Sequence, residues 1–455
     1  MSITTSDLRE RLTTQAERHG VPGAVLAVLH DGAVVEAATG VLNTRTGVAV
    51  TPDSVFQIGS VTKTWTATLV MQLVDEGLLD LDRPVRAYLP AFALADETAA
   101  AHVTVRHLLA HTAGFAGEDL TDYGRDEGAV AALVANLSGA AQVTEPGTLF
   151  SYNNAGFVVL GRLAEVLRGE SWGPMVRRWL AGPLGLGTVV TLPEQALLHR
   201  TAVGHVEVAG TPGPAPAWAL PRALDPAGGL AMSAADLLEF ARLHLRHGLA
   251  RDDARLLSRD SAEAMRTHQS APPPLSAFPG SYGLGMERHG WDGGTVLGHA
   301  GSTIGQYAYL RMVPEADVAV VLLTNGGGAE ALHADLVHPL LAELAGVRAP
   351  APVTPPAAAP LSDPGRYVGD FDMGVATIRI GHDGQGPLTM TVIPRVAAVE
   401  ALVTNPVTEL AALDDVRFVE VGSDRGEHRD VIFLDPGADG RFRILHNSRA
   451  MPRMA

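Results

Sequence analysis

A run of proline and alanine after residue 347 constrains the fold of this 455-residue chain more than any other feature. Its sequence is Arg348-Ala-Pro-Ala-Pro-Val-Thr-Pro-Pro-Ala-Ala-Ala-Pro. Such a segment stays extended, because each proline fixes its own backbone and removes a hydrogen-bond donor. We therefore expect two domains, residues 1–347 and 364–455, joined by a stiff linker over 348–363.

The larger part of the chain has strand patterns at both ends and helical patterns between them. An amphipathic helix beginning at Thr5 or Ser6 precedes two β-like runs that meet at Asp31-Gly32, a strong hairpin turn. This order predicts an α+β fold, in which helices flank an antiparallel sheet assembled from both ends of the domain, with a helical insertion between them. The expected strands are 23–30, 33–40, 282–286, 307–313 and 318–324, and the expected helices are 62–77, 105–112, 130–137, 154–169, 172–180, 234–247 and 331–344.

The smaller part alternates apolar and polar residues in short runs separated by glycine and aspartate. This pattern is typical of antiparallel strands joined by tight turns. It predicts a small all-β barrel or sandwich. The expected strands are 365–371, 376–380, 388–392, 416–421 and 431–434.

Charge and composition exclude several classes of function. The formal net charge of −16 argues against nucleic acid and against an anionic membrane surface as partners. The absence of cysteine excludes disulfides, thiolate zinc sites and a cysteine nucleophile. The sequence shows neither a basic region followed by an apolar export segment nor the ~18 apolar residues of a membrane span. We expect a cytoplasmic protein.

Ser60 and Lys63 are spaced as a candidate nucleophile and its base. In the run Ile58-Gly-Ser-Val-Thr-Lys63, the two side chains share one face of an expected helix, so the lysine amine can reach the hydroxyl. A serine hydroxyl is a weak nucleophile unless a neighbouring group accepts its proton. Because this spacing also occurs by chance, the interpretation depends on further parts of a site.

Two other segments supply such parts. Tyr152-Asn-Asn154 opens an expected helix and offers a phenol that can relay protons and an amide that can hold a carbonyl group. Gly298-His-Ala-Gly-Ser302 precedes an expected strand, so its backbone can lie beside a bound acyl group, with His299 in the same cleft. Three separated motifs in this order are far more specific than one.

These motifs resemble those of the penicillin-recognising serine hydrolases, which include class C β-lactamases, D,D-peptidases, esterases and D-amino-acid peptidases. The resemblance covers about residues 5 to 345 and extends to His107-Leu-Leu-Ala-His-Thr-Ala-Gly and Pro226-Ala-Gly-Gly-Leu-Ala-Met-Ser. It implies a β-lactamase-like fold. His299 stands where β-lactamases and transpeptidases usually have lysine, and this disfavours a dedicated β-lactamase.

The resemblance implies a role for each motif. Ser60 attacks an acyl carbonyl while Lys63 and Tyr152 share the proton transfers, and either of the two can be the base. The backbone N–H groups of Ser60 and Ser302 form the oxyanion hole. Asn154 holds an amide of the acyl group. His299 contacts the incoming or departing group. Gly301 lies beside the acyl chain.

A subgroup of this family, the penicillin-binding-protein-type thioesterases, releases and cyclises nonribosomal peptides. Its members are cytoplasmic, carry all three motifs and append a lipocalin-like domain after a linker, and this chain is similar in each respect. The resemblance implies that Ser60 takes a peptidyl group from a carrier-protein thioester and that the peptide's own amine displaces it. A basic group near the C-terminus, Arg449, is a candidate for contact with a substrate carboxylate.

Other interpretations stay open at this point. An intracellular esterase or a D-amino-acid peptidase or amidase of the same family is the main alternative to the cyclase. A β-lactamase and a receptor that stays acylated rank lower. No cofactor is expected, and the pair His107 and His111 lacks the glutamate and third ligand of a metal site.

Overall fold

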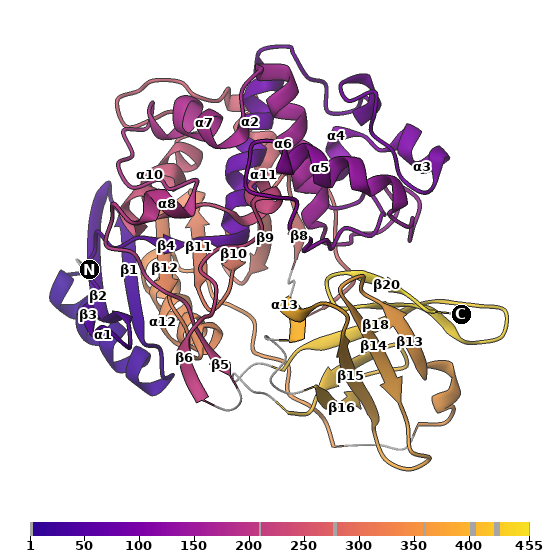
Figure 1. The fold of residues 1–455 in the computed structure, drawn as a ribbon. Coiled ribbons are helices and arrows are strands. Elements are labelled where there is room, and N and C mark those ends of the chain that lie inside the picture. The colour runs from indigo at the N-terminus through magenta and orange to yellow at the C-terminus, as the bar shows by residue number, and fades with distance from the viewer. Residues whose placement is uncertain are drawn as a thin grey trace.

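An eight-stranded antiparallel sheet forms the centre of the larger part of the chain (Figure 1). The computed structural model describes residues 3–208, 211–275, 280–357, 361–400, 406–422 and 428–454. The strand order is β3-β2-β1-β12-β11-β10-β9-β8. The strands are β1 (Gly23–His30), β2 (Ala33–Asn43), β3 (Val48–Ala49), β8 (Ser281–Tyr282), β9 (Glu287–Trp291), β10 (Gly294–Ser302), β11 (Tyr307–Val313) and β12 (Val318–Thr324).

The two ends of this part of the chain meet in the middle of the sheet. Ala24 on β1 lies opposite Thr324 on β12, in an antiparallel register that continues to the pair Leu29 and Ala319. The turn Asp31-Gly32 has positive φ at both residues, as a tight hairpin requires. The prediction of a sheet assembled from both ends, with a helical insertion between them, is confirmed.

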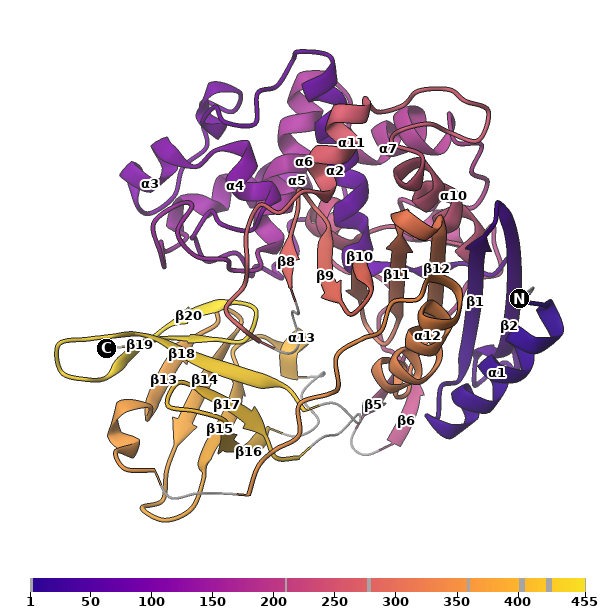
Figure 2. The same cartoon turned by 180° about the vertical axis from the view of Figure 1, so that it is seen from behind.

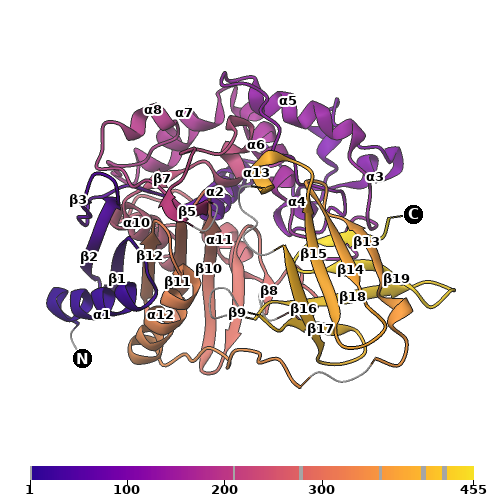
Figure 3. The ribbon, with the colours of Figure 1, turned by 60° about the horizontal axis from the view of Figure 1, so that its bottom comes forward.

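Alternation along the central strands assigns their side chains to two separate cores. On β1, Val25, Ala27 and Leu29 point toward the helical region, whereas Leu26 and Val28 point toward two helices on the opposite face. Those two helices are α1 (Thr5–Arg18) and α12 (Ala329–Ala345), which lie together on one side of the sheet (Figure 3). Because both faces are covered, the central strands β1 and β12 are almost entirely buried and mostly apolar.

The helical region covers the other face. Its α-helices are α2 (Thr62–Asp75), α3 (Glu97–His102), α4 (Val105–Leu109), α5 (Ala129–Asn136), α6 (Asn154–Arg168), α7 (Trp172–Val176), α8 (Pro193–Ala196), α9 (Asp225–Gly228), α10 (Ala234–Leu245) and α11 (Arg259–Arg266). Two short strand pairs accompany them, β4 (Phe56–Gln57) with β7 (Ala231–Met232) and β5 (His205–Val208) with β6 (Thr211–Pro214).

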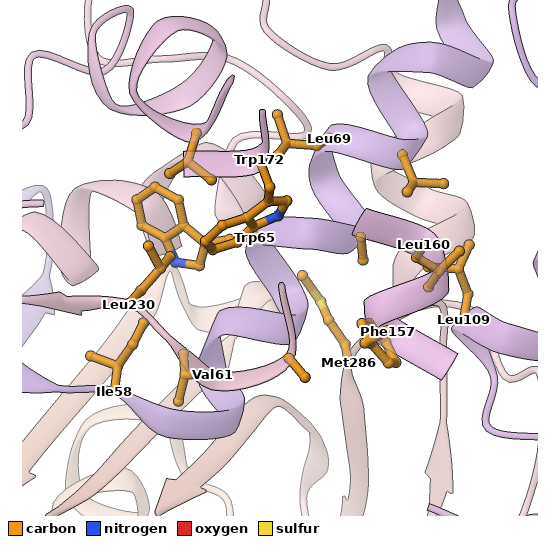
Figure 4. Packing of buried hydrophobic residues seen from close by; sticks show 14 of the residues in the cluster. Ile58, Val61, Trp65, Leu69, Leu109, Phe157, Leu160, Trp172, Leu230 and Met286 are labelled. Carbon is orange, nitrogen blue, oxygen red and sulfur yellow. The ribbon is translucent and has the colours of Figure 1, made fainter. Parts of the chain in front are cut away.

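Helix α2 runs through the middle of this region and is buried over nearly its whole length. Its Trp65 ring stacks on Phe240 of α10 with the ring centroids 4.1 Å apart. Figure 4 shows Trp65 beside Trp172 and Leu69, with Val61 at the start of the same helix. The first turn of α2 is therefore held in place by packing on all sides.

The first helix begins at Thr5, as expected, and is capped by Thr4, whose hydroxyl accepts from the Asp7 N–H. Other expected boundaries are wrong, and each has a local cause. The strand expected over 282–286 ends at Tyr282, because Gly285 takes a left-handed conformation against α2. The helix expected over 105–112 ends at Leu109, before His111 with φ 57°.

One further boundary differs from the expectation. The helix expected over 172–180 changes after Val176 into a π-helical turn, Arg177–Ala181. The segment Gly298–Ser302 precedes the strand β11, as expected, and itself forms the end of β10. Helix α6 begins at Asn154 and is closed by Gly169 in the left-handed conformation, also as expected.

The smaller part is an eight-stranded antiparallel meander that curls toward closure. A bridge between Phe371 and Arg453 links its first and last strands. The predicted small all-β barrel is confirmed in this nearly closed form. Its strands are β13 (Gly369–Asp372), β14 (Ala376–Gly381), β15 (Leu388–Pro394), β16 (Val407–Ala412), β17 (Arg417–Glu420), β18 (Asp430–Pro436), β19 (Phe442–His446) and β20 (Ala450–Pro452), and a short helix α13 (Ala397–Glu400) follows β15.

Three barrel strands were not anticipated from the sequence: β16, β19 and β20. The strand expected from Gly365 begins only at Gly369, because Asp363 caps a 3-10 turn, Pro364–Arg366. Residues 349–357 of the expected linker form neither helix nor strand, and 358–360 lie outside the described residues. The division of the chain into domains at 348–363 stays a prediction.

The barrel lies beside the β8 edge of the sheet, under the helical region (Figure 2). Arg429 contributes an ion pair to Glu330 of α12, with 2.9 Å between Nη2 and Oε1. The guanidinium of Arg417 donates to the carbonyl oxygen of Pro274 at 3.0 Å. In the part of the chain that the structure describes, no helix is long and apolar enough to cross a membrane.

Replacement of Trp65 by alanine tests the packing around α2. Trp65 is fully buried, so we expect Trp65→Ala to lower the free energy of unfolding by about 3–5 kcal/mol, whereas Trp65→Phe keeps the stacking on Phe240 and costs less. Urea denaturation followed by circular dichroism measures both. A loss below about 1 kcal/mol for Trp65→Ala would contradict this packing.

Candidate active site

Ser60 and Lys63 meet at the beginning of α2. Ser60 lies in a short 3-10 turn, Gly59–Val61, and Lys63 lies in the first turn of the helix that follows. Lys63 Nζ is 2.9 Å from Ser60 Oγ and 2.7 Å from the carbonyl oxygen of Ala227. The amine is therefore fixed at hydrogen-bond distance from the hydroxyl.

The surroundings of Lys63 favour its neutral form. The side chain is completely buried. Burial lowers the pKa of Lys63 well below 10.5, while the charge of Glu118 acts to raise this pKa and that of Arg449 acts to lower it. A neutral amine has a lone pair, so Lys63 can accept the proton of Ser60.

Tyr152 precedes α6 and covers the lysine. Its ring centroid is 4.9 Å from Lys63 Nζ, and its hydroxyl is hydrogen-bonded to Ser60. Burial raises the pKa of Tyr152 above its usual value, although the bond to Ser60 acts in the opposite direction. The resting site thus presents a neutral amine and a protonated phenol to the same serine.

The end of β10 lies against the turn that carries Ser60. A Cβ atom on Gly301 would be 2.0 Å from the carbonyl oxygen of Ile58 and 2.9 Å from the backbone nitrogen of Ser60. A Cβ atom on Gly59 would be 2.6 Å from the nitrogen of Ser302. The two glycines let the main chains of Ser60 and Ser302 approach each other, as an oxyanion hole made from both N–H groups requires.

His299 lies on β10 behind this surface and is 1% exposed. Its Nδ1 is 2.5 Å from the carbonyl oxygen of Ala300, which can only accept, so Nδ1 carries the proton. Its Nε2 is 2.9 Å from the hydroxyl of Tyr282, which donates to it. The family resemblance implies that His299 contacts the incoming or departing group, and this role stays a prediction. In the structure both of its ring nitrogens are bonded within the protein.

A buried carboxylate supports His299 and its strand. Both Glu287 oxygens accept from the Ala300 N–H at 3.2 Å, and Oε2 is 3.3 Å from Arg311 Nη1. Burial acts to raise the pKa of Glu287, but the neighbouring charges of His299 and Arg311 and a bond from His289 hold it below its usual range. Burial also lowers the pKa of His299 to about 4, against the effect of Glu287.

Asn154 and Arg449 converge on one carboxylate. Asn154 Nδ2 donates to the two oxygens of Glu118 at 3.0 and 3.1 Å, and Arg449 Nε donates to Oε1 at 2.9 Å. Arg449 lies in the turn between β19 and β20, and its guanidinium carbon is 5.1 Å from the Tyr152 ring centroid. The barrel therefore places a cation beside the tyrosine, with Glu118 as its counter-ion.

The sequence did not single out several residues of this site, which come from separate segments. They are Glu118, Ala227, Tyr282, Glu287 and Arg311. None belongs to a spaced motif, and their roles arise from strand pairing and loop packing. Only Ala227 lay in a stretch already noted for its resemblance to the family.

The histidines at 107 and 111 have separate structural roles. His107 Nδ1 accepts from the Thr104 N–H at 3.3 Å and completes the cap of α4. His111 Nδ1 accepts from the Asn153 N–H at 3.0 Å, and its ring lies 4.4 Å from that of Tyr152. Over the described ranges, no three histidine, aspartate or glutamate side chains are arranged to hold a metal ion.

Comparisons with known proteins agree with this fold and site. Residues 8–342 match the family described as Beta-lactamase. Penicillin-binding protein 4 of Amycolatopsis lactamdurans is 47% identical over 352 residues, which cover 77% of this chain and 92% of that protein. The unguisins hydrolase ungD of Aspergillus violaceofuscus is 23% identical over 335 residues, 67% of this chain and 58% of that protein.

The crystal structure of SurE with D-Leu matches the chain over its full length. The TM-score is 0.78 at 31% identity, and the match covers 99% of both chains, so it includes the barrel. An antiparallel sheet with Ser60 and Lys63 at the start of a buried helix defines a serine hydrolase fold. The chain belongs to the β-lactamase family of serine hydrolases.

Replacement of Gly301 by alanine tests the contact between β10 and the Ser60 turn. The added Cβ would force the two main chains apart, so we expect acylation of Ser60 to slow by about 100-fold or more, as for loss of an oxyanion donor. Gly290→Ala on β9 is the matched control, because nothing lies within 4 Å of its Cβ position. Labelling by a fluorophosphonate, followed by mass spectrometry, measures both; equal rates would contradict the arrangement.

Replacement of Arg449 by glutamine tests the electrostatics of Lys63. The change removes a nearby positive charge and leaves the Glu118 charge unpaired, so the pKa of Lys63 rises. The neutral amine then forms only at higher pH, and the acid limb of the labelling rate moves to higher pH. Arg443→Gln removes a pair with Asp439 on the barrel surface and should leave the limb in place. A shift to lower pH for Arg449→Gln would contradict the assignment.

Proposed function

We propose that this protein is a stand-alone thioesterase that forms an acyl-enzyme on Ser60 and releases a peptide by cyclising it. Formation of the acyl-enzyme is supported by one contact: the buried amine of Lys63 lies 2.9 Å from Ser60 Oγ. Lys63 is the base in this proposal, because burial favours its neutral form. Tyr152 keeps its proton and is the donor to the leaving group.

The two chemical steps balance in protons. As Ser60 Oγ attacks the thioester carbonyl, its proton passes to Lys63, and the Tyr152 proton passes to the departing thiolate. Lys63 returns a proton to Tyr152. The N-terminal amine of the peptide then attacks the ester, loses its proton to the same pair, and Ser60 leaves as the hydroxyl. The N–H groups of Ser60 and Ser302 hold the oxyanion in both steps.

The proposed cyclisation step is supported by the similarity of the whole chain to SurE. SurE shares both parts of the chain, and its structure with D-Leu supports a D-residue at the acyl end of the substrate proposed here. A peptidyl carrier protein, in the cytoplasm, would be the partner that presents the thioester. Lys63, Tyr282 and His299 are almost entirely shielded from solvent, which favours attack by an amine over attack by water.

Arg449 already has partners inside the protein, which weakens its attraction for a substrate carboxylate. Its Nε is already bonded to Glu118, and the guanidinium faces the Tyr152 ring. A substrate carboxylate would therefore meet a cation that is partly neutralised. Arg449 has two roles in this proposal. It contacts the substrate, and its charge lowers the pKa of Lys63. Asn154 stays a candidate contact for the acyl amide, and Gly301 lies where the acyl chain would pass.

Hydrolysis is the second candidate function. The unguisins hydrolase is a relative, and an esterase or D-amino-acid amidase would use the same acyl-enzyme with water as the acceptor. The site geometry serves both outcomes. We place the cyclase first because SurE, which includes the barrel, matches nearly the whole chain, whereas the hydrolase match covers two-thirds of it.

A synthetic peptidyl thioester with a C-terminal D-residue tests the function. We expect this protein to convert it to a head-to-tail cyclic peptide, detected by mass spectrometry as loss of the thiol without gain of water. Ser60→Ala should abolish the reaction. The matching thioester with a C-terminal L-residue should react at least about tenfold more slowly, a difference of 1.4 kcal/mol in transition-state binding.

Three other outcomes would contradict the cyclase. Only linear acid, with faster turnover of simple esters or D-amino-acid amides, would establish the hydrolase. A stable adduct on Ser60 with every substrate would indicate a receptor without turnover. Full activity in Ser60→Ala would overturn the acyl-enzyme itself.

A further inference from the structure

The hairpin formed by β19 and β20 makes three hydrogen bonds with the segment that carries Tyr152. These contacts involve three consecutive residues of that segment, the last of which is Tyr152, and they join the barrel to the catalytic part of the chain. They are His446 Nε2 to the Phe150 carbonyl oxygen at 2.7 Å, the Ala450 N–H to Ser151 Oγ at 3.1 Å, and the Tyr152 N–H to the Ser448 carbonyl oxygen at 2.9 Å.

The protonation of His446 follows from its two partners. The Phe150 carbonyl oxygen can only accept, so Nε2 carries a proton and donates to it. Nδ1 accepts from the Ser448 N–H at 3.3 Å, so this nitrogen carries none. The ring is completely buried, and burial lowers its pKa to about 4. His446 is therefore a neutral linker with one defined tautomer.

Ser448 occupies a backbone conformation that needs support. Its φ is 95°, in the left-handed region that serine rarely adopts. The His446 ring holds the N–H of this residue, and the carbonyl oxygen of the same residue accepts from Tyr152. A non-glycine residue in this region persists only where its surroundings hold it, and such residues cluster at functional sites.

We propose that His446 is a positioning residue that holds Tyr152 against Ser60 through the backbone of Ser448. The inference rests on the proposed role of Tyr152 in proton transfer. The ring fixes Ser448 in its conformation, the Ser448 carbonyl oxygen fixes the Tyr152 N–H, and the phenol reaches Ser60 from that anchored backbone. The barrel thus helps to build the catalytic site.

Other contacts hold the barrel to the larger part without touching Tyr152. The Arg429–Glu330 ion pair and the bond from Arg417 to the Pro274 carbonyl are made by residues outside the β19–β20 hairpin. Loss of the His446 ring should therefore leave the barrel docked. Misplacement of a catalytic group by about 1 Å can cost 100-fold in rate, so a small movement of Tyr152 is sufficient for a large effect.

The test uses the full chain and the saturable labelling of Ser60 by a fluorophosphonate. In this reaction the Ser60 Oγ–P bond forms, the P–F bond breaks, and the serine proton passes to the base. His446→Leu removes both ring bonds and should lower the maximal labelling rate about tenfold to 100-fold, with half-saturation changed less than twofold. His446→Gln keeps a donor toward Phe150 and should recover part of the loss.

Two comparisons separate positioning from general stability. Arg429→Gln removes a contact between barrel and catalytic part without touching Tyr152, and should leave the labelling rate within twofold. In a Tyr152→Phe background, His446→Leu should slow labelling by less than twofold further, because both changes act on the same phenol. If His446→Leu does not fold, the same comparison is made with His446→Gln.

Three results would overturn the positioning role of His446, and a fourth would contradict the role of Tyr152. An unchanged maximal rate in His446→Leu, or a full additional loss in the Tyr152→Phe background, would overturn the positioning role. A rate loss of similar size in Arg429→Gln would also overturn it, since docking alone would then explain the effect. An unchanged rate in Tyr152→Phe alone would instead contradict the proposed role of Tyr152 in the reaction.

Discussion

The buried contact between Lys63 and Ser60 is the interaction on which the rest of the site depends. A buried lysine favours its neutral form unless a carboxylate pairs with it directly. The carboxylate that acts most strongly to raise the pKa of Lys63, Glu118, is bonded instead to Arg449. The fold therefore uses burial to make a base. The same enclosure keeps the proton on Tyr152, which gives the two groups different roles.

The surrounding architecture serves that contact from three directions. Packing around α2 fixes the turn that carries Ser60, and Gly301 lets β10 lie against this turn. The charged cluster around Glu287 holds the main chain of β10 from behind. The barrel supplies Arg449 and the hairpin that touches Tyr152. The second part of the chain is thus a structural component of the site.

The sequence predicted what local patterns encode. The antiparallel sheet, its helical insertion and the small all-β second part follow from periodicity, and the proximity of Ser60 and Lys63 follows from helical spacing. The choice of a barrel over a sandwich came from the family resemblance. Glu118, Tyr282 and Ser448 could not be found in this way, because their roles arise from contacts between segments far apart in the chain. Barrel strands β19 and β20 were missed because they are short and are separated by a turn in which Ser448 has a positive φ, a conformation that serine does not signal.

The charge state of Lys63 can be measured directly in this chain. Lys63 is the only lysine among the 455 residues. Selective labelling of lysine with nitrogen-15 should therefore give a single side-chain amine signal in a nuclear magnetic resonance titration. We expect this signal to titrate well below pH 10.5 in the folded protein, because Lys63 is completely buried. Titration near 10.5, the ordinary value for an exposed lysine, would contradict it.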